Sequence, residues 1–285
     1  NSPTKIVRRP QRGQLALSLR PRERLAVRRR RRRVIMTIAG FFVGALGVWG
    51  AGALSYHDRL VIHDVSVSGT LALSASAVQA AFTQDLNEGE GRLFSRRNIF
   101  LYPERNLTEA LLEEFPRLES VAIARPSFLA QNVEVQVTER VGVYEWCRGG
   151  NCYLMDSLGY IFAPEENAEA IYTFQGGLIP TAGPIGQTFL KGRLDRVITL
   201  FKTLEAAGFT PHGATVENAN DLDIHLDKGF FLKVSFESDW DAVPKNLQLI
   251  ISSDALTNSL SKLDYVDLRF GNRVYYKLYG KEVTE

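Results

Sequence analysis

The feature that most constrains this chain is an uninterrupted apolar segment near its N-terminal end. Residues 34–54, VIMTIAGFFVGALGVWGAGAL, contain no charged side chain over 21 positions. A helix rises about 1.5 Å per residue, so this length matches the roughly 30 Å hydrocarbon core of a bilayer. Trp49 and Tyr56 lie toward the far end, where aromatic rings favour the membrane interface. We therefore expect a single N-terminal transmembrane helix over 34–54.

The charge distribution predicts how that helix is oriented. Residues 1–33 hold 13 of the 34 Lys and Arg residues but only one of the 32 Asp and Glu residues, so residues 34–285 carry a net charge of −10. An unbroken basic run precedes the apolar segment: Arg28, Arg29, Arg30, Arg31, Arg32 and Arg33. We interpret this run as a membrane topology signal that keeps a disordered basic tail, 1–33, in the cytoplasm. The remainder would be exported.

The N-terminal part allows two other interpretations. Ala51-Gly52-Ala53 resembles a signal-peptide cleavage site, but the apolar segment is longer than the usual signal core of about 7–15 residues. Nucleic-acid binding by the Arg run is disfavoured, because no aromatic side chain is interleaved to stack on bases. An uncleaved anchor is the favoured interpretation.

The two cysteines lie in the exported part. Cys147 and Cys152 flank Arg148-Gly149-Gly150-Asn151, a turn-like loop between two strand patterns. In an oxidising compartment a disulfide between them is the favoured interpretation, with free thiols as the alternative. They have no neighbouring His and do not form a C-x-x-C pair, which argues against a metal or redox site.

Apolar periodicity over residues 60–140 predicts the order strand, helix, helix, strand, strand. The predicted elements are a strand over 60–68, a helix over 75–82 capped by Ser74, a helix that begins at Asn106 or Thr108 and stops at Pro116, and strands over 118–124 and 132–140. The last strand is the clearest, because Val133, Val135 and Val137 alternate with polar residues.

Residues 143–280 read mainly as strands with inserted helices. Short strands are predicted at 144–147, 152–156, 160–162, 214–217, 222–226 and 230–236, and amphipathic helices over 190–207 and from Asp239 or Asp241 to 252. Strands over 263–270 and 273–279 flank Gly271-Asn272, a two-residue hairpin signal. Because no further strand pattern follows 273–279, we expect the outer edge of this last strand to need protection or a partner.

The sequence offers no grouping typical of catalysis. Its four histidines, His57, His63, His212 and His225, are scattered without metal-ligand spacing. Asp221 and Asp223 share one strand face, which suits a solvated surface as well as a catalytic dyad. We therefore expect no catalytic, cofactor-binding or metal-binding residues and no small-molecule substrate. A membrane-tethered periplasmic enzyme is the less favoured alternative.

An ordered set of motifs resembles one bacterial family. In its strand-helix-helix-strand-strand context, RPSFLAQNVEVQVTER (125–140) resembles the POTRA module, which receives partner polypeptides. Trp146 and an L-x-D-x-x-G-x-x-F pattern follow, with Leu154, Asp156, Gly159 and Phe162. These motifs, placed after one transmembrane helix and ahead of Asp267-Leu268-Arg269, resemble the FtsQ/DivIB family of cell-division proteins. Where that family usually has Pro after the Glu-Arg pair, this chain has Val141-Gly142.

The resemblance implies an α+β fold and a domain order. We expect a cytoplasmic tail (1–33), a transmembrane helix (34–54), a β-α-α-β-β POTRA-like domain (60–140), a mainly antiparallel, bent β-sheet domain with inserted helices (141–280) and a C-terminal tail (281–285). The family is a non-enzymatic scaffold of the divisome in the bacterial inner membrane, with its bulk in the periplasm at the division septum. A secreted POTRA-containing transport component is an alternative, but no strands of an outer-membrane barrel follow.

The resemblance also implies partners, FtsB and FtsL, and a binding surface. In the family a segment of FtsB adds as a strand to the terminal strand of the β domain. By motif position the contacts carry over to Phe270, after Asp-Leu-Arg, and to the final strand: Arg273, Tyr275, Tyr276, Lys277 and Leu278. Alternation leaves open which face of that strand meets the partner.

Overall fold

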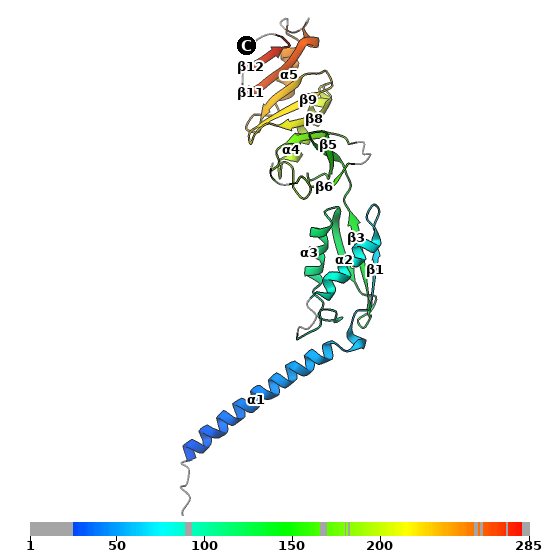
Figure 1. The fold of residues 1–285 in the computed structure, drawn as a ribbon. Helices are drawn as coiled ribbons and strands as arrows, with labels where there is room; N and C mark the ends of the chain where they lie inside the picture. The colour runs from blue at the N-terminus through cyan, green and yellow to red at the C-terminus, as the bar shows by residue number, and fades with distance from the viewer. Residues whose placement is uncertain are drawn as a thin grey trace, which may run out of the picture.

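The computed structural model describes residues 25–88, 93–165, 170–179, 181, 183–253, 256, 259–271 and 273–280. Helix α1 (Leu25–Ser55) projects from one end, followed by a unit built on a three-stranded sheet and then by a nine-stranded sheet (Figure 1). The expected C-terminal tail, 281–285, and residues 1–24 of the expected cytoplasmic tail lie outside the described residues.

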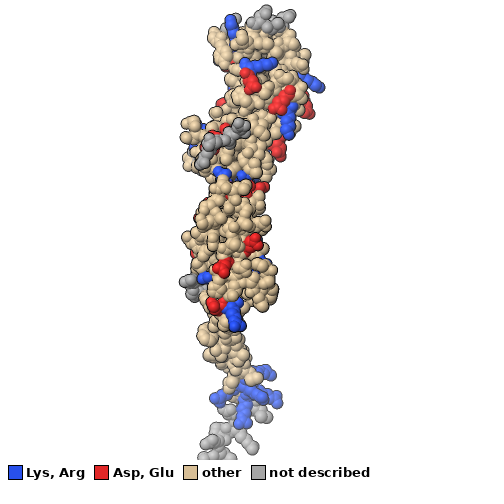
Figure 2. Space-filling view, turned by 90° about the vertical axis from the view of Figure 1, so that its right-hand side faces the viewer, with Lys and Arg blue, Asp and Glu red and all other residues tan. Residues whose placement is uncertain are grey.

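Helix α1 contains the expected membrane segment. Its Val27–Ser55 part is long and apolar enough to cross a membrane, and residues 27–50 are exposed, so packing within the chain does not account for its apolar surface. The expected disorder of residues 1–33 is wrong for residues 25–33, because the Arg28–Arg33 run continues the helix. Arg is a strong helix former, and no Gly or Pro interrupts this part. The run lies exposed at the N-terminal end of α1 (Figure 2).

The three-stranded unit contains five elements in chain order: β1 (Asp64–Ser68), α2 (Ala75–Asn87), α3 (Glu104–Glu114), β2 (Leu118–Ala124) and β3 (Asn132–Glu139). Strand β3 lies in the middle of the sheet, parallel to β1 and antiparallel to β2. Parallel pairing of β1 with β3 requires a long connection, which the two helices and β2 supply.

This unit has its own core on one face of its sheet. Along β3 the side chains alternate between exposed and buried at all eight positions. The buried ones pack with side chains from both helices: Val133, Val135 and Val137 with Val78, Phe82, Leu86, Leu107 and Leu111. Full burial of such a side chain contributes about 1.5–3 kcal/mol, so the helices are held to this face by apolar packing.

Several boundaries in this unit differ from the prediction. The Ser74 hydroxyl bonds to the Ser76 hydroxyl at 2.7 Å and makes no capping bond to α2, which runs on to Asn87. Helix α3 begins at Glu104 rather than at Asn106 or Thr108, because Pro103 occupies the N-cap and its carbonyl accepts the Leu107 N–H. Strand β1 begins at Asp64 rather than at Leu60, because Leu60 ends a 3-10 turn, η1 (Asp58–Leu60), and Val61 forms an isolated bridge with Asn98.

The larger sheet has nine described strands in the order β12-β11-β10-β9-β8-β7-β4-β5-β6. Their bounds are β4 (Tyr144–Arg148), β5 (Asn151–Met155), β6 (Ile161–Pro164), β7 (Thr173–Gly176), β8 (Pro211–Val216), β9 (Asp221–Leu226), β10 (Phe231–Ser235), β11 (Leu263–Phe270) and β12 (Arg273–Leu278). The predicted strands do not include β7, whose sequence TFQG has a single strongly apolar side chain, Phe174, and so shows no strand pattern.

This sheet is mixed: most of its neighbouring pairs are antiparallel, but three are parallel. Among the described strands, β4–β7, β7–β8 and β10–β11 pair in parallel, and the other five neighbouring pairs are antiparallel. Helix α4 (Leu194–Ala206) connects β7 to β8, and α5 (Val243–Ile251) connects β10 to β11. Each helix is a crossover, and a crossover allows neighbouring strands to run in the same direction.

Both crossover helices bury their apolar stripe against the sheet. Helix α4 contributes Leu194, Val197, Leu200, Phe201 and Leu204 to the core, and α5 contributes Val243 and Leu247. Helix α4 begins four residues later than predicted, because Leu190 adopts a φ of 43° and Gly192 a φ of 72°, outside the helical region. The core of the larger unit is therefore built by two helices on one face of a mixed sheet.

Glu139, at the end of β3, organises the loop that follows β1. Its buried carboxylate accepts the backbone N–H groups of Leu71, Ala72 and Leu73 at 2.6, 3.0 and 2.9 Å. Burial alone would raise the pKa of Glu139, but these three donors outweigh burial and lower the pKa below its usual value.

The next residue, Arg140, joins the two units. Its Nη1 donates to Asp156 Oδ2 at 2.6 Å, and its guanidinium lies 4.3 Å from the centre of the Tyr160 ring. The other oxygen of Asp156 accepts the backbone N–H groups of Leu158 and Tyr160, both at 2.9 Å. The connection between the units is thus fastened by one ion pair whose acidic partner is held by the backbone.

Candidate interaction surface

Strand β12 forms one edge of the nine-stranded sheet, and β6 forms the other. It pairs antiparallel with β11 and lies at the end of the molecule opposite α1 (Figure 1). No strand in the described part of the chain pairs with its outer edge. Such an edge presents a row of backbone N–H and C=O groups to any strand that can approach.

The two faces of β12 differ in what they contact. Three side chains pack against the core: Val274, Tyr276 and Leu278. Because side chains alternate along a strand, Tyr275 and Lys277 lie on the opposite, outer face. The register agrees, since Tyr276 lies opposite Val266 of the apolar core, whereas Tyr275 lies opposite Asp267, which is ion-paired with Arg269. The structure thus shows which side chains of β12 face the core, a question that the alternating pattern left open.

Phe270 and Tyr275 form an aromatic pair on the outer face. Their ring centroids are 5.4 Å apart in an edge-to-face arrangement, and the Phe270 side chain is 54% exposed. The Arg269 guanidinium lies 5.5 Å from the centre of the Phe270 ring. Arg273, opposite Phe270 in the register, is also exposed. This pair is therefore an accessible aromatic surface at the hairpin end of β12.

Lys277 lies farther along the same face and is held in place. Its Nζ is 3.1 Å from a carboxylate oxygen of Asp264 and 5.9 Å from the centre of the Tyr265 ring. A lysine on an edge strand disfavours indiscriminate strand pairing. In this protein the ion pair with Asp264 fixes the position of Lys277.

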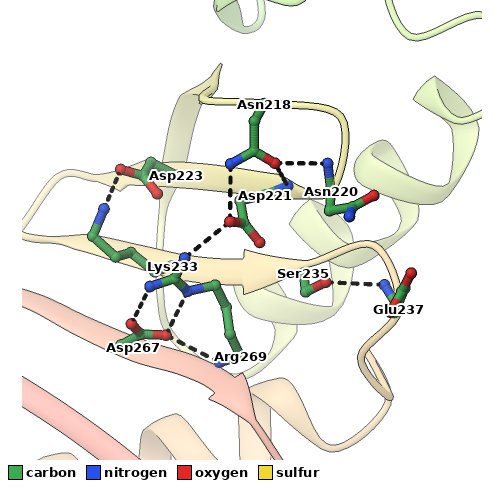
Figure 3. A network of polar contacts seen from close by, with 9 residues as sticks. All are labelled: Asn218, Asn220, Asp221, Asp223, Lys233, Ser235, Glu237, Asp267 and Arg269. Atoms are coloured by element: carbon green, nitrogen blue, oxygen red, sulfur yellow. Dashed lines mark hydrogen bonds and ion pairs between the residues drawn. The ribbon is translucent and has the colours of Figure 1, made fainter.

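A polar network fastens the neighbouring strands across the same face (Figure 3). Arg269 Nη2 donates to Asp267 at 2.6 Å, and its Nη1 donates to Asp221 at 3.0 Å. Lys233 Nζ lies 2.8 Å from Asp223 on β9. The hydrogen bond to Asp267 is the main reason that the pKa of Arg269 is raised further above its usual value. Strands β9, β10 and β11, which lie next in the sheet after β12, are therefore joined by ion pairs.

Asp221 and Asp223 do share one strand face, as predicted, but each is held by a cation. The hydrogen bond from Asn218 lowers the pKa of Asp221; partial burial acts against it, and Arg269 adds to the lowering. A general acid or base works best with a pKa near the operating pH, so a carboxyl with a lowered pKa is poorly suited to that role. The geometry favours a structural role for this pair.

The structure brings together two histidines that the sequence leaves apart. His212 and His225, on neighbouring strands β8 and β9, have ring centroids 6.0 Å apart. His225 Nε2 lies 2.9 Å from the Thr215 hydroxyl, and His212 lies 3.4 Å from Asp227. Burial first, and then the nearby His212, lower the pKa of His225. Only cross-strand register reveals this contact, because the residues are 13 positions apart in the sequence.

Cys147 and Cys152 lie directly opposite each other on β4 and β5 and are joined by a disulfide. Glu145 is close to both sulfur atoms, and this trio is the one His, Cys, Asp and Glu cluster of metal-binding geometry among the described residues. Thiolates bind metals, whereas sulfur atoms engaged in a disulfide do not offer that charge. The cluster therefore has the chemistry of a cross-strand link.

No family model and no curated protein matches this chain. The functional interpretation therefore depends on the chain's own geometry and on its motifs. Among the described residues, Asp221 and Asp223 are ion-paired and the two cysteines are bonded to each other, whereas β12 is an edge strand whose outer side has no pairing strand.

Proposed function

We propose that this chain is a membrane-anchored, non-enzymatic scaffold that binds a partner polypeptide by strand addition at β12. The observation that carries the proposal is the outer edge of β12, which no described strand pairs with, beside exposed Phe270 and its half-buried neighbour Tyr275. In strand addition, backbone hydrogen bonds supply affinity and side-chain contacts supply specificity. Aromatic side chains frequently dominate the energy of such interfaces.

We also propose that this chain belongs to the FtsQ/DivIB family. The unit of β1 to β3 would then be the POTRA-like domain, and the nine-stranded sheet would be the family's β domain. The order of elements from β1 to β3 and the motif residues Arg140 and Asp156 at the junction support this assignment. The chain would lie in the bacterial inner membrane at the division septum, with the Arg28–Arg33 run in the cytoplasm and both sheets in the periplasm.

The proposed partner strand is a segment of FtsB, with FtsL in the same complex. Six residues of β12 can pair with a strand of about 20 Å. A partner strand there would continue the sheet, with Phe270 and Tyr275 available to its side chains on the outer face. Lys277 is paired with Asp264 on the neighbouring strand β11.

Binding of FtsB from the same bacterium to the full chain in nanodiscs tests the proposal. We expect Phe270→Ala and Tyr275→Ala each to weaken binding by at least about fivefold, which corresponds to about 1 kcal/mol. Leu158→Ala is the matched control, because Leu158 is an exposed apolar residue distant from β12. Unchanged affinity in both aromatic variants, with folding verified by circular dichroism, would exclude this surface.

Amide hydrogen exchange tests the binding mode. Strand addition predicts that FtsB slows the exchange of alternate backbone amides over 273–278, because an antiparallel or parallel partner pairs with every second residue. Strand β6, the opposite edge, serves as the internal control and should not change. Protection at β6 instead of β12 would contradict the proposed site.

Localisation of a fluorescent fusion tests the cellular role separately from the site. Enrichment at mid-cell during constriction is the expected result for a divisome scaffold. A uniform signal around the envelope would argue against a division role and in favour of a transport component.

A further inference from the structure

A loop of the first unit is fastened to the last turn of α1. The backbone N–H of Ser95 donates to Ser55 Oγ at 2.9 Å, and the Asn98 side-chain amide donates to the Ser55 carbonyl at 2.9 Å. Both Ser55 and Asn98 are buried. These bonds hold residues 93–101 at a defined height beside the end of the helix.

The loop contacts α1 at a position that belongs to the apolar segment. Gly52 belongs to the uncharged run 34–54 and is itself buried. It has no Cβ, and a Cβ there would collide with the carbonyl oxygen of Leu93. The Leu93 backbone therefore packs against the helix three residues before Ser55, which is about 4.5 Å deeper along the helix axis.

Exposed apolar side chains gather on this loop and on the neighbouring loop 125–131. Six of them are between 40% and 73% exposed: Leu93, Phe94, Phe100, Leu101, Phe128 and Leu129. The rings of Phe100 and Phe128 are 4.9 Å apart and so join the two loops into one surface. Arg125 lies 5.8 Å from the centre of the Phe100 ring and adds a cation at its margin. Soluble surfaces rarely expose this many adjoining apolar side chains without a partner.

We propose that loops 93–101 and 125–131 form a membrane-contact surface that inserts into the bilayer leaflet nearest the two sheets. The inference rests on the proposed membrane anchoring of α1. If residues 34–54 cross the hydrocarbon core, the Leu93 backbone at the level of Gly52 already lies at its boundary. Aromatic and apolar side chains with a neighbouring Arg suit that interface, because rings favour the head-group region and the cation pairs with lipid phosphate.

Photo-crosslinking of the full chain in nanodiscs of phosphatidylethanolamine and phosphatidylglycerol tests the inference. A photoreactive phenylalanine analogue would replace Phe128, Leu71 or Phe42, one position in each sample. All three side chains are exposed. Leu71 is the control within the same unit, because Glu139, at the opposite end of β3, holds its backbone about 25 Å from loop 125–131.

We expect the probe at Phe128 to form lipid adducts at least about tenfold more often than the probe at Leu71. Adducts to lipid at Phe42 but not at Phe128 would overturn the inference and leave the anchor intact. Adducts of the Phe128 probe to a second copy of the chain, or to another protein in cells, would also overturn it. A lack of lipid adducts at Phe42 would overturn the proposed anchoring itself.

A second pair of variants tests the depth argument directly. Gly52→Leu should displace the 93–101 loop from α1, because the added side chain meets the Leu93 backbone. We expect it to reduce lipid adducts from a probe at Phe94 by about tenfold. Gly47→Leu is the matched control, because open space surrounds Gly47. Equal yields in the two variants would contradict the close packing of the loop on the helix.

Discussion

Arg140 and Asp156 form a 2.6 Å salt bridge across the junction of the two units, with only 19% and 11% of their side chains exposed. Arg140 ends the segment that leaves β3, whereas Asp156 follows β5 of the larger sheet. The pair therefore helps to hold the two units together at their junction.

Arg140→Met should destabilise the protein, because it leaves the mostly buried Asp156 carboxylate without its cation. Loss of one partner of a buried pair costs about 3–5 kcal/mol, and the remaining exposure here places the expected loss at about 2–3 kcal/mol. Urea unfolding measures it. Arg105→Met is the control, since Arg105 and Glu109 form an exposed pair on α3 that should contribute little. Equal effects in the two variants would contradict this account.

Glu139→Gln should remove a pH-dependent part of the stability. The folded-state pKa of Glu139 lies below its usual 4.5, so its ionised form stabilises the fold above about that pH. This contribution is lost as the pH falls through the folded pKa. We expect the variant to be less stable than the parent at pH 7 and the difference to shrink by pH 3. Glu134→Gln, an exposed position on the same strand, should show no such convergence.

Reduction of the Cys147–Cys152 disulfide should lower the free energy of unfolding modestly. The ring spans six residues, and the chain-entropy model gives about 2 kcal/mol for a loop of that size. Thermal unfolding with and without dithiothreitol measures the change. The double variant Cys147→Ser, Cys152→Ser should resemble the reduced protein and should not respond to dithiothreitol. A reductant effect of the same size in that variant would exclude the disulfide as its cause.

Tyr276→Ala and Tyr275→Ala should separate the two faces of β12. Tyr276 packs against the core, so its truncation leaves unfilled space and should cost about 2–3 kcal/mol of stability. Tyr275 lies on the outer face and should cost less than about 1 kcal/mol. Chemical denaturation of both variants makes the comparison. A larger loss for Tyr275→Ala would mean that the facing of the strand is reversed.

Local elements with strong periodicity were predictable from the sequence. Strands 118–124 and 263–270 have the predicted bounds, and apolar and polar residues alternate along 266–270. The helix over 190–207 was found to within four residues at its start. Elements with weak sequence patterns were missed or misplaced. Strand β7 was missed, and α3 begins after Pro103 rather than at a polar capping residue.

Contacts between distant residues were not predictable. Cross-strand register brings His212 beside His225, and the two crossover helices make part of the sheet parallel. The surface of Phe100 and Phe128 combines two loops that are separated in sequence by α3 and β2. Neither contact leaves a signal in the local pattern.

The sequence by itself determined the apolar helix, the basic run before it and the alternation that makes 263–278 a hairpin, because these depend on the order of side chains along one segment. Only the tertiary structure decided that Tyr276 faces inward and Tyr275 outward, and that Leu93 packs beside Gly52. Such facts depend on which segments meet in space. The packing of the whole core determines which segments meet, and the periodicity of one segment does not predict it.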